Sequence, residues 1–140
     1  MMPAMSMQHE IDPKQEILER VGNLDGIEVF GADILLAVYQ RPSKTSSGII
    51  LTDRYRDEDK WQGKTHLVLK MGPTAFIDDE GKQFRDIKAG DWVVLRPSDG
   101  QLVTLNTLKK SAISKDDTIL CRIAQDATIR MRIDHPDQIW

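Results

Sequence analysis

Cysteine is almost absent from the 140-residue sequence, in which Cys121 stands alone. One thiol cannot form a disulfide within its own chain, so the fold must depend on its hydrophobic core, and a reducing compartment suits this composition. No apolar run approaches the roughly 18 residues that a membrane-spanning helix needs. Residues 1–10 also lack the basic start and apolar centre of a signal peptide. We therefore expect a soluble, intracellular protein without a membrane partner.

The sequence also lacks a strong excess of either charge. The formal net charge is −3, so no basic face for nucleic acid is predicted. Hydrophobic residues make up 40% of the chain, and this length is enough for one domain with a real core.

Recognisable catalytic and metal-binding patterns are missing as well. His9, His66 and His135 lie far apart and have no close ligand partners at metal spacing. The sequence has no glycine-rich phosphate loop and no nucleophile elbow. Cys121 lies in an apolar stretch typical of an inert core thiol. The residues therefore indicate a binding or assembly module, not an enzyme, and no metal or cofactor is expected.

A short helix is predicted after the first ten residues. Asp12 can cap it, Pro13 suits its first position, and Gln15 fits a variant of the capping box. One apolar stripe follows at helical spacing: Ile17, Leu18 and Val21. Gly22 or Gly26 would end the helix.

The rest of the chain predicts β-structure. Six short strands are expected, at 28–41, 65–72, 91–97, 101–106, 118–124 and 127–134. Ser98-Asp99-Gly100 predicts a hairpin turn between the third and fourth strands. In the last strand one side is expected to be apolar (Ile129, Met131, Ile133) and the other basic (Arg130, Arg132). Strands of this length and spacing are typical of a small β-barrel or sandwich.

Three segments stand outside these strands. Residues 42–64 and 107–117 are polar connections. Residues 76–84 predict a protruding hairpin, with Phe76, Ile77 and Phe84 arranged around a Glu80-Gly81 turn.

The stretch KTSSGIILTD, residues 44–53, carries three large aliphatic residues in a row: Ile49, Ile50 and Leu51. Small polar residues precede them and charged residues follow. Two interpretations remain open for the triplet. It could be a strand docked on its own barrel, or an exposed segment that binds a partner.

The order and spacing of five stretches resemble the GroES (chaperonin-10) family, from about Asp33 to Ile133. The stretches are ADILLAVYQRP, KTSSGIILTD, WQGKTHLVLKMG, FIDDEGKQFRDIKAGDWVVL, and DGQLVTLN with TILCRIAQDATI. The resemblance implies a GroES-like small β-barrel with a long loop and a roof hairpin. The domain prediction is a tail and helix over 1–27, the barrel over 28–134, and a tail over 135–140.

The resemblance also implies a function. In the family, the loop is disordered when free and pairs as a strand with the apical groove of a GroEL-type chaperonin. Gly48 would then be the hinge, and Ile49, Ile50 and Leu51 would bind the groove, each contributing about 1.5–3 kcal/mol on burial. Ordering the loop lowers the affinity of each copy, and a homo-oligomeric ring restores it through avidity.

Contacts between copies are implied at the roof hairpin, through Phe76, Ile77 and Phe84. Trp140 would either contact a neighbouring copy or fold back on its own barrel.

Several segments exceed the family pattern: about thirty residues before the first strand, residues 107–117, and the C-terminal tail. They resemble GroES-like proteins encoded by bacteriophages, which implies a co-chaperonin in the cytoplasm of an infected host. The alternative is a decoration or cement protein on the capsid surface, in which Tyr55 and Trp61 would contact the major capsid protein.

Overall fold

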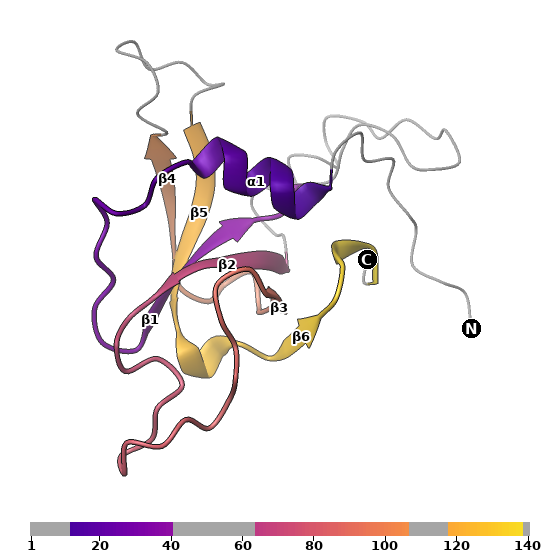
Figure 1. Ribbon diagram of the computed structural model, residues 1–140. Coiled ribbons are helices and arrows are strands. Elements are labelled where there is room, and N and C mark those ends of the chain that lie inside the picture. Colours follow the sequence, from indigo (N-terminus) through magenta and orange to yellow (C-terminus); the bar gives the residue numbers. More distant parts are fainter. Residues whose placement is uncertain (1–11, 41–63, 107–117, 139–140) are drawn as a thin grey trace, which may run out of the picture.

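One antiparallel sheet and one covering helix form the framework of the described part of the chain (Figure 1). The computed structural model describes residues 12–40, 64–106 and 118–138. Its elements are α1 (Pro13–Val21), β1 (Asp33–Val38), β2 (Thr65–Met71), β3 (Trp92–Val94), β4 (Gln101–Asn106), β5 (Thr118–Gln125), η2 (Asp126–Thr128), β6 (Met131–Ile133) and η3 (Pro136–Gln138). The prediction of a mainly β, GroES-like small barrel with an N-terminal helix is confirmed.

The sheet has the strand order β4-β5-β1-β2-β3-β6. β1 is central, because it pairs with β2 on one side and with β5 on the other. β3 and β4 follow each other in the chain but lie on opposite sides of β1. The predicted hairpin at 98–100 is therefore wrong, and this turn belongs to a connection that crosses the sheet. Turn residues specify a change of direction, but they do not specify which strand pairs next.

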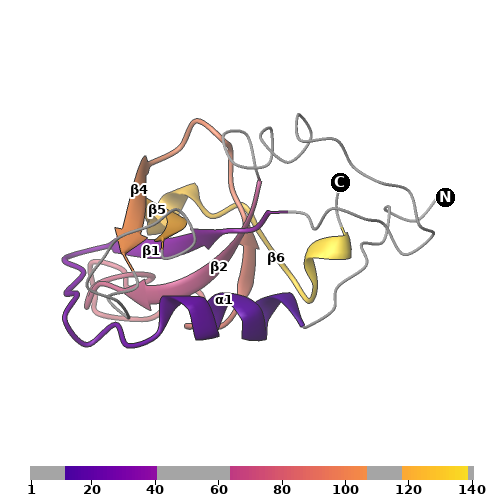
Figure 2. The ribbon, with the colours of Figure 1, turned by 90° about the horizontal axis from the view of Figure 1, so that it is seen from above.

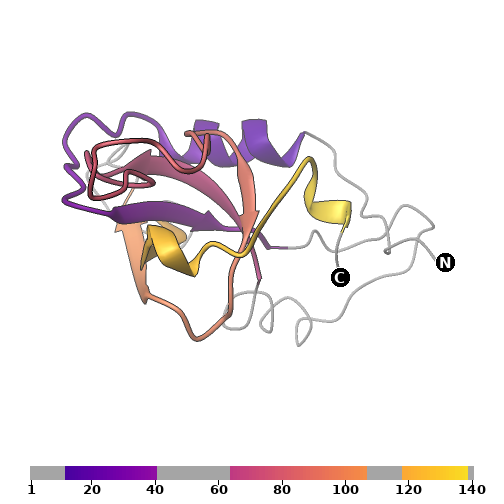
Figure 3. The same cartoon turned by 90° about the horizontal axis from the view of Figure 1, so that it is seen from below.

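The β3–β4 connection and α1 cover opposite faces of the sheet (Figures 2 and 3). Gly100 shows how closely the connection packs on β5. Its φ is +75°, and a Cβ at this position would lie 2.3 Å from the carbonyl oxygen of Ile123. Because glycine has no Cβ, the connection can pass this close to β5 at residue 100.

Helix α1 begins and ends where the sequence predicts. The Asp12 carboxylate accepts a hydrogen bond from the Gln15 amide at 3.3 Å, and Gly22 caps the C-terminal end. Ile17 and Val21 are buried against the sheet, but Leu18 is 43% exposed, so its predicted place in the buried stripe is wrong. Three apolar residues on a short helix do not specify which of two neighbouring residues is buried.

The linker from α1 to β1 is held by a lysine of β2. The Lys70 ammonium group donates to the carbonyl of Leu24 at 2.9 Å and to the carbonyl of Ile27. Turn hydrogen bonds around Gly31, whose φ is +59°, then lead the chain into the sheet. The first strand consequently begins at Asp33, five residues later than predicted.

Two apolar clusters form the core, one on each face of the sheet. The helix-covered cluster contains Ile17, Val21, Leu35, Ala37, Tyr39, Leu67, Leu69, Trp92, Ile119 and Cys121. The opposite cluster contains Ile34, Leu36, Val68, Ala75, Phe76, Ile87, Val93, Leu95, Ala124 and Ile129. Cys121 is fully buried, so its predicted place in the core is confirmed, and burial raises the pKa of its thiol to about 12.

The last predicted strand is shorter than expected. Residues 126–128 form a turn of 3-10 helix, and only Met131–Ile133 pair with β3. Ile129 is buried as predicted, whereas Met131 is 46% exposed and does not belong to an apolar inner side. A three-residue edge strand leaves little surface on which alternation could be expressed.

Candidate functional site

Seven of the predicted contact residues lie outside the described part of the chain: Gly48, Ile49, Ile50, Leu51, Tyr55, Trp61 and Trp140. Their roles stay predictions. The structure nevertheless describes the residues on either side of the 41–63 segment, at the end of β1 and the start of β2.

These two points lie side by side on paired strands. Val38 near the end of β1 pairs with His66 near the start of β2. The Tyr39 amide then donates to the carbonyl of Thr65 at 3.0 Å. These hydrogen bonds hold Tyr39 and Thr65, which lie just before and just after the segment, next to each other.

A buried polar network lies directly beneath this position. We call it the His66–Arg122 network; it consists of the two side chains and the carbonyls of Lys64, Pro97 and Asp99. His66 Nδ1 lies 3.1 Å from the Lys64 carbonyl, and Arg122 Nε donates to His66 Nε2 at 3.1 Å. Because Nε2 accepts from arginine, Nδ1 carries the proton and donates to Lys64.

Arg122 continues the network into the β3–β4 connection. Its Nη1 donates to the carbonyls of Pro97 and Asp99, each at 2.6 Å. Arg122 is opposite Leu36 in the β1–β5 ladder, so the two side chains share the face that the connection crosses. The guanidinium group therefore ties the crossing segment to the middle of the sheet.

The network is costly to bury. His66 is 0% exposed and Arg122 is 2% exposed. Nη2 of Arg122 has no hydrogen-bond partner in the described part of the chain. Burial, together with the Arg122 cation, lowers the pKa of His66 from 6.5 to about 4. Burial also lowers the pKa of Arg122, while nearby Asp99 acts in the opposite direction.

The predicted hairpin at 76–84 is present and extends away from the sheet (Figure 1). Ile77 and Gln83 form a bridge, and Gly81 turns the chain with φ +78°. The Asp78 carboxylate accepts from the amides of Glu80 and Lys82, at 3.0 and 2.8 Å. This carboxylate therefore stabilises the turn.

The three hydrophobic residues of the hairpin have different environments. Ile77 is 38% exposed and Phe84 is 51% exposed, so both present apolar surface. Phe76 is 0% exposed, which places its side chain in the protomer's own core and not on the surface expected of a roof contact. Its φ is +61°, and the Asp126 carboxylate accepts its amide at 2.8 Å. The roof role stays a prediction for Ile77 and Phe84.

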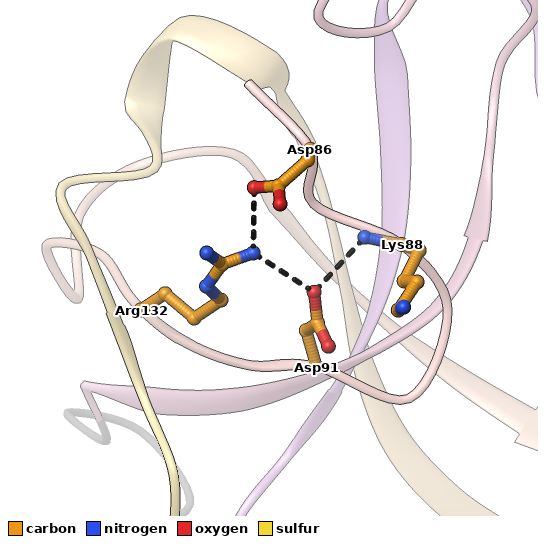
Figure 4. Close-up of polar contacts among 4 residues, drawn as sticks. All are labelled: Asp86, Lys88, Asp91 and Arg132. Carbon is orange, nitrogen blue, oxygen red and sulfur yellow. Dashed lines mark hydrogen bonds and ion pairs between the residues drawn. The ribbon is translucent and has the colours of Figure 1, made fainter.

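A surface ion cluster joins the chain after the hairpin to β6 (Figure 4). Arg132 lies 2.9 Å from Asp86 and 3.5 Å from Asp91, and Asp91 also accepts the Lys88 amide at 3.1 Å. These carboxylates raise the pKa of Arg132. The cluster thus holds the C-terminal strand against the turn that precedes β3.

Within residues 12–40, 64–106 and 118–138, no three metal-ligating side chains gather into a site. The helices of this part of the chain are too short and too polar to cross a bilayer. The described residues thus form a barrel with a protruding hairpin, and Gln40 and Lys64 flank the 23-residue segment 41–63.

Comparison with family models identifies this arrangement. The model described as "Chaperonin 10 Kd subunit" matches residues 26–123, which is most of the chain. The chain belongs to the chaperonin-10 family. Members of this family are non-enzymatic co-chaperonins that oligomerise and work with GroEL-type chaperonins. No curated protein matches the chain in sequence.

The match covers β1 to β4 and most of β5, and it leaves two described parts of the chain outside. These are α1, together with the start of its linker, and the segment from Ala124 to Gln138. Both pack on the barrel, the helix through Ile17 and Val21 and the C-terminal segment through β6 and Arg132.

Sequence reasoning missed the His66–Arg122 network. The two residues are 56 positions apart, and no local pattern joins them. One signal was available: His66 directly precedes the apolar residues 67–69, and Arg122 stands between the apolar residues 119–121 and 123–124. A polar residue buried at such a position needs a partner.

Proposed function

We propose that the protein is a co-chaperonin that caps the folding chamber of a GroEL-type chaperonin ring. The observation that carries this proposal is the family match over residues 26–123. This match includes residues 48–51, which lie in the connection between the paired strands β1 and β2. The Gly-Ile-Ile-Leu sequence at that place supplies a glycine, the residue type with the widest choice of backbone conformations, followed by three aliphatic side chains.

The chemistry of binding would be burial of these aliphatic residues in an apolar groove. Each would contribute about 1.5–3 kcal/mol if fully buried, less the cost of ordering the segment. Several copies in one assembly would bind through several such segments at once, and avidity would raise the overall affinity.

The test is co-elution with a GroEL-type ring in size-exclusion chromatography with light scattering, with and without ATP. The wild-type protein should co-elute in the presence of nucleotide. Ile50→Asp should not, because an aspartate in an apolar groove is strongly disfavoured. Ser46→Asp is the matched control, since it adds the same charge to the same segment but outside the triplet, and it should still bind.

Thermal unfolding of Ile50→Asp separates the two interpretations of the triplet. An unchanged melting temperature is expected for a residue that binds a partner. A variant that melts far below the wild type would place Ile50 in the core of its own barrel, and the docking role would then be wrong.

The segments that exceed the family pattern support a bacteriophage origin, with the cytoplasm of an infected host as the place of action. These segments are about thirty residues before the first strand, residues 107–117 and the C-terminal tail. They also give the second candidate function, a decoration or cement protein on the capsid surface. A wild-type protein that ignores the chaperonin with and without ATP, but binds capsids assembled from the major capsid protein, would establish this alternative.

A further inference from the structure

We infer that His66 and Arg122 are positioning residues, which fix the base of the 41–63 segment so that it can engage a chaperonin productively. This inference rests on the proposed function and adds to it a pair of buried side chains that do not touch the partner.

The network reaches the backbone at Lys64, at the base of the 41–63 segment. Lys64 is the first described residue after the segment, and its carbonyl accepts two hydrogen bonds. One comes from His66 Nδ1 and the other from the Leu95 amide, each at 3.1 Å. The backbone at the end of the segment is therefore held from two directions.

The network is continuous from Lys64 to the β3–β4 connection. From the Lys64 carbonyl, hydrogen bonds lead through His66 and Arg122 to the carbonyls of Pro97 and Asp99. These carbonyls belong to the connection that crosses the sheet. The base of the segment is thereby joined to β5 and to the crossing connection, and not only to its own strand.

Burial of the Arg122 side chain costs free energy. Arg122 places a positive charge in the core with neutral acceptors as its direct hydrogen-bond partners, and one of its nitrogens has none in the described part of the chain. Apolar side chains of similar volume would avoid the cost of a buried charge. They could not supply the directional hydrogen bonds by which the pair joins the Lys64 carbonyl to the crossing connection.

The test is the double variant His66→Leu with Arg122→Met. It removes both side chains of the network at once and leaves the Lys64 carbonyl its bond from the Leu95 amide. We expect the variant to fold with the native mass of the wild type and to melt at a lower temperature, because the Pro97 and Asp99 carbonyls lose their donor. Affinity for the chaperonin with ATP should fall by about 2- to 30-fold, the range found for residues that act on a binding site from a distance.

The matched control lies at the other end of β1. Ile34 is 0% exposed and pairs with Met71 and Ala124, away from Lys64. Whichever of Ile34→Val and Ile34→Ala loses as much or more thermal stability than the double variant should bind the chaperonin like the wild type. Equal loss of affinity in this control would show that reduced stability explains the effect, and the inference would be wrong.

A measurement on the wild-type protein covers the case in which the double variant does not fold. Hydrogen exchange of the Leu95 amide should slow when the chaperonin binds, while that of the Gly72 amide, which donates to Asp33 at the far end of β1 and β2, should not. Equal changes at both amides would overturn the inference.

The outcomes also separate the two proposals. A wild-type protein that does not bind overturns the co-chaperonin proposal, and the positioning role with it. A double variant that is folded and binds as tightly as the wild type overturns the positioning role alone.

Discussion

His66 links the stability of the protein to pH. Its pKa is lowered from 6.5 to about 4 in the folded state, so the unfolded chain binds the proton more readily between these values. Stability therefore rises with pH through this range and levels off above about 6.5. As pH falls from 6.5 to 4, this residue alone should remove about 3 kcal/mol, since one pKa unit is worth about 1.4 kcal/mol.

Urea unfolding at closely spaced pH values between 4 and 7 measures this effect. His66→Gln keeps hydrogen-bonding capacity but cannot titrate, so the difference in unfolding free energy between wild type and variant should vary with pH across that window. Parallel curves for the two proteins would contradict the prediction.

A comparison of Gly100 with Gly81 measures the free-energy cost of placing a side chain in the crossing connection. Both have positive φ, +75° and +78°, but a Cβ at Gly81 would meet nothing within 4 Å, whereas at Gly100 it would meet the Ile123 carbonyl. Gly81→Ala should cost about 1–2 kcal/mol, the price of a left-handed conformation. Gly100→Ala should cost clearly more, because the backbone must also move.

Denaturant unfolding of the two alanine variants tests this difference. Equal losses of unfolding free energy would show that the connection can shift away from β5 at little cost.

At the scale of elements, α1 is a hydrophobic cover for one face of the sheet. Ile17 is 9% exposed and Leu18 is 43% exposed, and they are neighbours on the same helix. Ile17→Ala should lower the unfolding free energy by about 2–5 kcal/mol. Leu18→Ala, which changes a similar side chain on the solvent side, should stay within about 1 kcal/mol of the wild type. Thermal and urea unfolding of the pair would show whether α1 is part of the folded core.

The elements themselves could largely be predicted from the sequence, because each rests on local chemistry. The Asp12 cap, the Gly22 stop and the turn of the 76–84 hairpin all depend on residues within one or two turns of chain. Alternation likewise locates β2, whose Leu67 and Leu69 face the helix while Val68 faces the other way.

The pairing of the elements could not be predicted, because it depends on distant residues. Nothing local in Ser98-Asp99-Gly100 distinguishes a hairpin from a crossing, and the choice is stabilised by Arg122, more than twenty residues further along the chain. The candidate site shows the same limit. The triplet at 49–51 stands out in the sequence, but the His66–Arg122 network joins residues 56 positions apart and is formed only by the fold.

At the scale of the whole molecule, the exposed apolar residues of the hairpin bear on assembly. The family oligomerises, and Ile77 and Phe84 are available on the hairpin surface. In the proposed homo-oligomer, Phe84→Ser should weaken the contacts between copies and lower the native mass at low protein concentration, while the barrel stays folded. Leu18→Ser, an equivalent change on the exposed side of α1, should leave the mass unchanged.

Light scattering over a dilution series, with circular dichroism as a check of folding, decides this prediction. A Phe84→Ser variant that dissociates at the same concentration as the wild type would exclude the hairpin from the contacts between copies.

The central position of β1 has a consequence for how the chain is made. β1 is among the first strands to leave the ribosome, yet one of its two partners, β5, begins at Thr118. Synthesis proceeds at about 5–20 residues per second, so β1 waits several seconds with one edge unpaired. During that interval its apolar side chains are incompletely covered, and the nascent chain is open to aggregation. A protein proposed to assist the folding of others would thus complete its own barrel only when its translation is nearly finished.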